Sequence, residues 1–302
     1  MKFKDKIGVV TVLYNSSNVV EDFYFSIINQ TYDNLFLYVI DNNSPDNSYE
    51  LIMKLAESHQ DRVFVIHNDN NLGVATANNI GIKLALQDSC DYVLLSNNDT
   101  VFESDTVEKL YTGLVTNNAT MAVPKIINHF SNKIWAAGGC FLKFKGTTRH
   151  IGTGANIYDD NYNKVYKCDY SPTCFMLIKK EVFSRVGYMD DNFFVYYDDT
   201  DYLWRATQLG HERLFYVPSS IVRHKESSCT EGEFSDFSLR FLHRNAILFV
   251  LKHFNLYRVT LAILYRCLQF IFKYSFVLNR KQLKIVFDSY IEGYNLYRNI
   301  YR

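Results

Sequence analysis

The sequence has few cysteines, and no two of them lie close together. Its 302 residues contain six, without a CxxC pair: Cys90, Cys140, Cys168, Cys174, Cys229 and Cys267. Zinc ribbons need paired cysteines at short spacing, and disulfide scaffolds need a high cysteine density. The spacing excludes both classes, and we expect reduced thiols in a cytoplasmic protein.

Long hydrophobic runs are also missing. No uninterrupted apolar stretch approaches the roughly 20 residues that cross a bilayer, and the N-terminus, MKFKDKIGVV, lacks the features of a signal peptide. Hydrophobic residues nevertheless make up 48% and charged residues 21% of the chain, which excludes intrinsic disorder. We expect a folded cytoplasmic protein, and the C-terminal segment decides whether it also meets the inner face of the cell membrane.

The net charge is zero, but its distribution along the chain is uneven. Residues 237–302 contain 11 Lys/Arg against 2 Asp/Glu, a net charge of +9, which leaves −9 for residues 1–236. Opposite signs indicate two parts with different roles. We expect a catalytic domain over 1–236 and a basic amphipathic helical extension over 237–302. The basic residues are interspersed with apolar ones, so we expect no nucleic-acid partner.

The extension is expected to contain a helix with one narrow polar stripe, about 80° wide at 3.6 residues per turn. The stripe consists of Arg258, Arg266, Gln269, Lys273 and Arg280. Most other residues on that helix are apolar, so it must be covered by the catalytic domain, by a second copy in a homodimer, or by a bilayer surface. The positive stripe favours peripheral membrane contact, and the other two coverings remain open.

Dinucleotide and P-loop motifs are absent, since the chain has no GxGxxG and no Walker loop. The first hundred residues instead alternate between apolar runs and helical patterns. Strands are expected at 7–13, 35–41, 62–67 and 91–96, and helices at 19–30, 48–58 and 75–87. This alternation predicts an α/β fold with a mostly parallel sheet flanked by helices.

The expected domain divides into two halves. Residues 1–100 form a nucleotide-binding half, because each strand is followed by polar side chains and ligands bind at the carboxyl ends of such strands. Residues 101–228 mix Gly-rich pieces, a helix near 179–186 and an acidic cluster, and form an acceptor and metal half. A short polar linker then leads into the extension.

Three acidic positions are candidates for chemistry. Asp99 directly follows a strand, where a carboxylate can hold Mg²⁺ or simply form a turn. Asp199 lies in the acidic cluster 198–201, which can supply a general base or cap the helix that follows. Asp41 ends the second strand, where it can accept a hydrogen bond from a nucleoside or form a turn.

Two further positions have an ordinary structural interpretation as well. Gly73, after Asp69-Asn70-Asn71, can mark the start of a helix. His224, in IVRHKESS, is a lone histidine, and such residues are more often structural than ligands.

Taken together, five sequence blocks resemble family 2 glycosyltransferases of the GT-A fold. In chain order they are VVTVLYNSSNVVEDFYFSIINQ, VIDNNSPDNS, NNLGVATANNIGI, YVLLSNNDT and GYMDDNFFVYYDDTDYLWRATQLG, and VRH closes the series. The resemblance covers residues 7–228, about three quarters of the chain. The Asn-x-Asp form of the metal motif and the glycine-rich middle look most like a rhamnosyltransferase-like branch.

The resemblance implies a role for each matching residue. The base pocket would be lined by Thr11, Tyr14 and Asp41; the nucleotide and donor sugar would be bordered by Asn70, Gly73, Asn78, Asn97 and Asn98; Asp99 and His224 would hold Mg²⁺ or Mn²⁺; and Asp199 would be the catalytic base. One departure matters, because the family often has Asp-x-Asp where this chain has Asn97-Asn98-Asp99. An amide is a weaker ligand than a carboxylate, so the metal would depend more on the substrate phosphates.

We therefore expect an inverting glycosyltransferase that uses a nucleoside diphosphate sugar, dTDP-rhamnose or a UDP-sugar, and a hydroxyl of a cell-surface glycan or lipid-linked acceptor. Two other classes stay open. One is a nucleotidyltransferase that makes sugar nucleotides, although VTVLYNSSN lacks the phosphate loop it would need. The other is a catalytically silent subunit that recruits glycan enzymes to a membrane.

Overall fold

A computed structural model of the chain describes residues 3–225 and 234–302. The N-terminal part is a sheet with strand order β3-β2-β1-β4, all parallel. Its strands are β1 (Ile7–Leu13), β2 (Leu35–Asp41), β3 (Val63–His67) and β4 (Tyr92–Ser96). The four expected strands are confirmed within one residue. Cys229 and most of the expected linker lie outside the described residues.

Helices cover both faces of this sheet. They are α1 (Val20–Ile28), α2 (Ser48–Ala56), the short turn η1 (Glu57–His59), α3 (Val74–Gln87) and α4 (Thr106–Thr116). Alternate residues of β1 belong to different cores, because Val10 packs with α3 whereas Val9 and Leu13 pack with α1, α2 and α4. This two-sided burial explains why the strands are almost continuously apolar.

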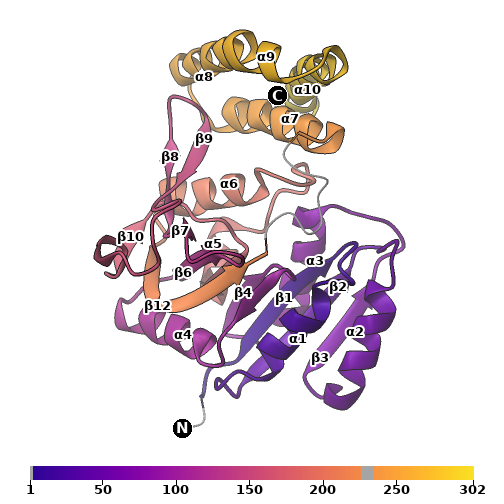
Figure 1. Cartoon of the computed structure of the whole chain (residues 1–302), viewed down its shortest axis with the longest axis vertical. Coiled ribbons are helices and arrows are strands. Elements are labelled where there is room, and N and C mark those ends of the chain that lie inside the picture. The colour runs from indigo at the N-terminus through magenta and orange to yellow at the C-terminus, as the bar shows by residue number, and fades with distance from the viewer. Residues whose placement is uncertain (1–2, 226–233) are drawn as a thin grey trace.

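The second half extends the sheet with strands of mixed direction. It adds β5 (Thr100–Phe102), β6 (Met121–Asn128), β7 (Ile134–Ala136), β10 (Tyr166–Cys168), β11 (Phe175–Lys179) and β12 (Leu214–His224). Strand β11 runs antiparallel to both β4 and β6, whereas β12 is parallel to β6. A separate hairpin, β8 (Gly139–Leu142) and β9 (Thr147–His150), rises from this half (Figure 1). The expected α/β fold, with a sheet flanked by helices, is confirmed, and its parallel strands are concentrated in the first half.

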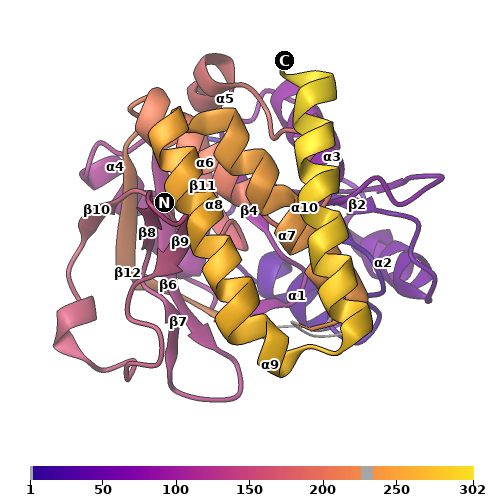
Figure 2. The same ribbon diagram turned by 90° about the horizontal axis from the view of Figure 1, so that it is seen from above.

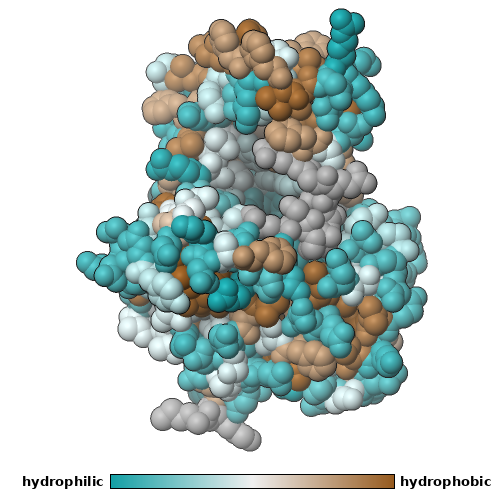
Figure 3. Space-filling model, in the orientation of Figure 1, coloured by the Kyte–Doolittle hydropathy of each residue, from teal (hydrophilic) through white to brown (hydrophobic). Residues whose placement is uncertain are grey.

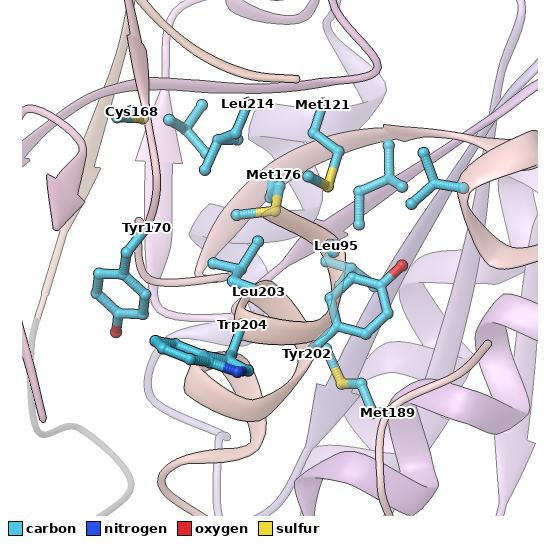
Figure 4. Close-up of a cluster of buried hydrophobic side chains, with 14 of the residues drawn as sticks. Leu95, Met121, Cys168, Tyr170, Met176, Met189, Tyr202, Leu203, Trp204 and Leu214 are labelled. Carbon is cyan, nitrogen blue, oxygen red and sulfur yellow. The ribbon is translucent and has the colours of Figure 1, made fainter. Parts of the chain in front are cut away.

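Short helices complete the second half. They are η2 (Asp160–Tyr162), α5 (Lys180–Val186), α6 (Asp198–Leu203) and the π-helix η3 (Trp204–Leu209). Tyr202, Leu203 and Trp204 project from α6 and η3 into a buried cluster with side chains of β4, β6 and β11 (Figure 4). This cluster fixes the position of the acidic segment that begins α6.

The C-terminal helices form a layer above the sheet (Figure 1). They are α7 (Asp236–His253), α8 (Leu256–Gln269), the π-helix η4 (Phe270–Tyr274), α9 (Ser275–Val277) and α10 (Arg280–Ile300). Viewed from above, α8 and α10 lie on either side of α7 (Figure 2). Among the described residues, no helix is both long enough and apolar enough to cross a bilayer.

The predicted polar stripe of the extension is wrong in two respects. The helix ends before Leu278, so Arg280 starts a different helix from Arg258 and Lys273. Arg266 is buried, and its guanidinium donates to the Gly146 carbonyl oxygen at 3.0 Å. The predicted helix is present over α8, but its basic residue Arg266 points into the core and not to solvent.

Helix α7 belongs to the main core. Leu248, Phe249 and Val250 are buried with residues of the sheet and of η3, and the Phe249 ring lies 5.7 Å from that of Trp204. Helix α10 packs closely on α7 at Gly293, where a Cβ would lie 2.3 Å from the Arg244 carbonyl oxygen. The inner part of the extension thus shares one core with the sheet.

We predict that Phe249→Ala destabilises the whole chain by about 3–5 kcal/mol, because a fully buried ring leaves a cavity. Phe276→Ala, in the same extension, should change the free energy of unfolding by less than about 0.5 kcal/mol, since its ring is 83% exposed. Urea unfolding followed by tryptophan fluorescence measures both. Equal, small losses would mean that α7 folds independently of the sheet.

Candidate active site

The candidate site lies where β1, β2 and β4 end, at one edge of the sheet. Asn98 ties two of these ends together, because its side-chain amide donates to the Val12 carbonyl oxygen at 2.6 Å and to Ser16 Oγ at 2.9 Å. Asn97, by contrast, is exposed, and so is Tyr14 in the first polar turn of the chain. Asn98 therefore braces the site, while Asn97 and Tyr14 face outward.

Asp41 ends β2 and is fully buried. Its Oδ2 lies 2.7 Å from His67 Nδ1, and its Oδ1 has no hydrogen-bond partner among the described residues. The Thr11 hydroxyl, buried in β1, likewise has no partner in the described part of the chain. Buried acceptors without a partner are costly, so these atoms mark a place for a ligand N–H or a water.

His67 was missed by the sequence analysis. It ends β3, and the parallel register pairs it with Asp41. The His67 imidazole pairs with Oδ2 of Asp41 and leaves Oδ1 available to a ligand. The only sequence signal was its position, as the last residue of the strand next to Asp41.

The start of α3 contacts Phe194, in the segment that leads into α6. Gly73 has φ +82°, and a Cβ there would lie 2.5 Å from the Phe194 carbonyl oxygen, which accepts a hydrogen bond from Val74 N at 2.6 Å. Asn78 is buried one turn further along α3, whereas Asn70 is exposed. Gly73 is thus required for a close approach between two motif blocks about 120 residues apart.

Asp99 and His224 form a buried pair. Their Oδ1 and Nε2 atoms lie 3.1 Å apart without hydrogen-bond alignment. Strand pairing holds them, because Thr100 of β5 is opposite His224 of β12 and Lys225 N donates to the Asp99 carbonyl oxygen. Carboxylate oxygen and imidazole nitrogen are both ordinary metal ligands.

This pair fits a divalent metal only in part. Neither imidazole nitrogen of His224 has a hydrogen-bond partner in the ranges 3–225 and 234–302, which suits a ligand. No group of three His, Cys, Asp or Glu side chains with metal-binding geometry occurs in those ranges. Two protein ligands plus substrate phosphates and water is the arrangement Mg²⁺ commonly takes.

Asp199 is the second residue of α6, and this helix directly follows two residues with left-handed backbone. Tyr196 and Tyr197 have φ of +62° and +64°, which costs roughly 1–3 kcal/mol each in a non-glycine residue. Asn245 of α7 compensates, since its amide donates to the carbonyl oxygens of Val195 and Tyr196 at 2.8 Å each. The C-terminal helices therefore hold the backbone that presents Asp199.

The three carboxylates of α6 have different environments. Asp198 is buried, and desolvation together with the charge of Asp199 raises its pKa to about 8. Asp201 is fully buried, yet its pKa lies well below the usual range, because pairing with His253, Arg205 and Lys252 outweighs desolvation. Burial thus disfavours the ionised form of Asp198, whereas Asp201 is an ion-pair partner.

Asp199 keeps some solvent exposure, in contrast to its neighbours. The Tyr170 hydroxyl donates to its Oδ2 at 2.7 Å and the Thr200 hydroxyl to its Oδ1 at 3.0 Å. Burial raises its pKa, and these two donors counteract the rise. Of the three carboxylates, Asp199 is the one that can both be reached and take up a proton.

A series of rings connects the two acidic centres. His224 lies 4.8 Å from Trp135, Trp135 lies 4.6 Å from His150, and His150 lies 6.0 Å from Tyr170, measured between ring centroids. Tyr170 stands at the edge of the buried cluster near Trp204 (Figure 4). Three of these rings, Trp135, His150 and Tyr170, were missed because they come from the irregular middle of the chain.

The buried thiol of Cys174 lies near both acidic centres. Burial raises the pKa of this thiol, and the charges of both Asp99 and Asp199 raise it further. A hollow of about 670 Å³ adjoins the ring series, lined by residues 148–153 and Tyr162. The structure therefore brings Asp99, His224 and Asp199 into one neighbourhood with space beside it.

The chain is similar in sequence to known glycosyltransferases. The sequence model described as Glycosyl transferase family 2 matches residues 8–187. The chain is 26% identical over 233 residues to glycosyltransferase GlyG of Streptococcus pneumoniae serotype 4, covering 76% of this chain and 74% of GlyG. It is 26% identical over 179 residues to the dTDP-rhamnosyl transferase RfbF of Shigella flexneri, covering 59% and 55%.

Among solved structures, the fold is similar to GalNAc-T7 with UDP, GalNAc and Mn²⁺, at a TM-score of 0.67 and 15% identity. The match covers 97% of this chain and 57% of GalNAc-T7, so the chain spans little more than half of that protein. This likeness concerns the fold. It confirms the expected GT-A architecture, here followed by C-terminal helices.

We predict that Tyr170→Phe moves the titration of the Asp199 carboxyl to higher pH. The lost hydroxyl donates to the ionised carboxylate, so its removal disfavours ionisation. Carbon-detected NMR of the aspartate carboxyls measures the midpoint. Tyr158→Phe, at an exposed tyrosine, is the control, and an unchanged Asp199 midpoint in Tyr170→Phe would contradict the assigned hydrogen bond.

Proposed function

The chain belongs to glycosyl transferase family 2, and on that premise we propose that it transfers a sugar with inversion from a nucleoside diphosphate sugar to an acceptor hydroxyl. The observation that carries this proposal is that the rings of Trp135, His150 and Tyr170 join the buried Asp99–His224 pair to Asp199. One end of the group suits a diphosphate and the other a proton transfer. The reaction needs both.

Asp199 is the proposed base. Its carboxylate takes the proton of the acceptor hydroxyl while that oxygen attacks the anomeric carbon and the bond from that carbon to the diphosphate breaks. A raised pKa suits this task, because a base is most effective when its pKa approaches the working pH. Tyr170 orients the carboxylate through the 2.7 Å hydrogen bond.

Asp99 and His224 are the proposed protein ligands of Mg²⁺ or Mn²⁺. When bound, such an ion offsets the charge that develops on the departing diphosphate. Their burial and mutual approach support this role, as does the Mn²⁺ in GalNAc-T7. Asn97 is exposed at this point, which agrees with a larger share of the metal's ligands coming from the substrate.

The donor is proposed to be dTDP-rhamnose or a UDP-sugar. Asp41 Oδ1 and the Thr11 hydroxyl have no partner in the described residues, and we expect a base N–H to bind there. The exposed Tyr14 is proposed to line the same pocket. Asn70, Gly73 and Asn78 follow on the α3 side. The rhamnosyl choice is supported by the similarity to RfbF and the UDP choice by the ligand of GalNAc-T7.

The acceptor is proposed to be a cell-surface glycan or its lipid-linked precursor, held in the hollow next to His150. A lipid-linked acceptor would bring the enzyme to the inner face of the cell membrane as a peripheral protein. Incubation with a panel of sugar nucleotides and Mg²⁺ or Mn²⁺ tests the function. Slow donor hydrolysis supports a transferase, pyrophosphate-dependent turnover would indicate a nucleotidyltransferase, and absence of donor binding would indicate a silent subunit.

We predict that Asp199→Asn lowers kcat about 10²–10⁴-fold, the usual contribution of a general base, with donor affinity nearly unchanged. Asp198→Asn is the matched control and should retain most activity, because Asp198 is buried and its raised pKa disfavours the ionised form. A transfer assay and calorimetry with the donor measure the two effects. Retention of a tenth or more of kcat in Asp199→Asn would move the base to another residue.

We predict that Asp99→Ala weakens metal-dependent donor binding at least tenfold, whereas Asn97→Ala has a smaller effect. A carboxylate offers a full negative charge to a divalent ion, and an exposed amide offers only a dipole. Calorimetry with donor at fixed metal concentration measures both. Equal losses, or activity that EDTA leaves unchanged, would remove Asp99 from the metal site.

A further inference from the structure

The outer face of the C-terminal helices is unusually apolar. Of the 26 large hydrophobic residues that are exposed in the described part of the chain, 13 lie after residue 255. The corresponding region at the top of the space-filling view shows apolar side chains over α8 and its neighbours (Figure 3). A surface helix normally turns its polar side to solvent, so we expect another molecule to cover this face.

The exposed apolar side chains lie on α8, η4, α9 and α10. These side chains, which we call the outer face, are Leu256, Tyr257, Ile263, Leu264, Leu268, Ile271, Phe272, Phe276, Val277, Phe287, Ile291, Tyr294 and Ile300. Ala262 and Arg266, on the other side of α8, are buried against the domain. Helix α8 is thus apolar on the side that no described part of the chain covers.

Basic residues accompany the outer face. Residues 256–302 contain 8 Lys/Arg and 2 Asp/Glu, and Lys273, Arg280 and Arg298 are exposed. Both acidic residues are paired: Asp288 lies 3.4 Å from Lys284, and Glu292 receives two hydrogen bonds from Arg240 of α7. The face is therefore both apolar and positively charged.

We propose that the outer face docks on an anionic lipid bilayer surface, with Phe272 and Phe276 inserted at the level of the headgroups. This inference deepens the proposed function and rests on it in one respect: a lipid-linked acceptor would give the enzyme a reason to bind a membrane. Apolar burial and attraction to anionic lipid act together in such contacts. In a symmetric dimer, the basic residues of one copy would face those of the other. The resulting repulsion disfavours a second copy as the partner of the outer face.

The structure reassigns which residues meet the membrane. The sequence pattern placed the contact on a basic stripe that included Arg266, but this side chain points inward to Gly146 and Tyr197. Exposed aromatic residues of η4 and α9 take its place at the surface. The contact is thus predicted to depend on apolar insertion as well as on salt.

The test is flotation of the full-length protein with vesicles of phosphatidylcholine alone and of phosphatidylcholine with 30% phosphatidylglycerol. We expect salt-sensitive binding to the anionic vesicles. Phe272→Ser with Phe276→Ser should lower the partition coefficient at least tenfold, and Lys273→Glu with Arg280→Glu should lower it at least tenfold for anionic vesicles only. Phe25→Ser on α1 and Lys54→Glu on α2, both exposed positions, should bind like wild type.

The outcomes are separable from those for the proposed function, because flotation needs no donor and donor hydrolysis needs no membrane. Absence of wild-type binding, or equal binding by the outer-face variants, would overturn the proposal. A wild-type dimer in light scattering that Phe272→Ser with Phe276→Ser converts to a monomer would also overturn it, in favour of a second copy. Circular dichroism of each variant checks that loss of binding is not loss of folding.

Discussion

The buried carboxylate of Asp201 holds the molecule's two layers together. Its oxygens are paired with Arg205 of η3 and with Lys252 and His253 of α7, and its side chain is fully buried. Removal of one partner from such a group leaves an uncompensated buried charge, which typically costs about 3–5 kcal/mol. The acidic segment and the C-terminal helices must therefore be in place together, although they are separated by the polar segment before α7.

The same connection explains how the extension contributes to the site. Asn245 and Arg266 contact the Tyr196–Tyr197 segment, which has strained backbone and leads directly into Asp198 and Asp199. One side of the helical layer thus supports the proposed base. The other side is the outer face, so a single layer both supports the site and exposes the apolar residues of the proposed bilayer contact.

The site could be predicted where it depends on strand ends. Asp41 and Asp99 were found because parallel strands end at one edge of the sheet, and Asp199 because an acidic run begins a helix. The rings of Trp135, His150 and Tyr170 could not be found, since they come from irregular segments whose proximity depends on long-range packing. The pairing that separates Asp201 from Asp199 was equally hidden, because it depends on residues of α7 about 50 positions away.

The sequence by itself determined the α/β class, the strands of the first half and the apolar, basic character of the extension, because alternation and composition are local properties. Only the tertiary structure decided which carboxylate stays reachable, which oxygen of Asp41 remains unpaired, and which side of α8 faces outward. These features depend on burial and on partners distant in the chain. A local pattern can indicate that a helix has two unlike sides, but only packing decides which side the core covers.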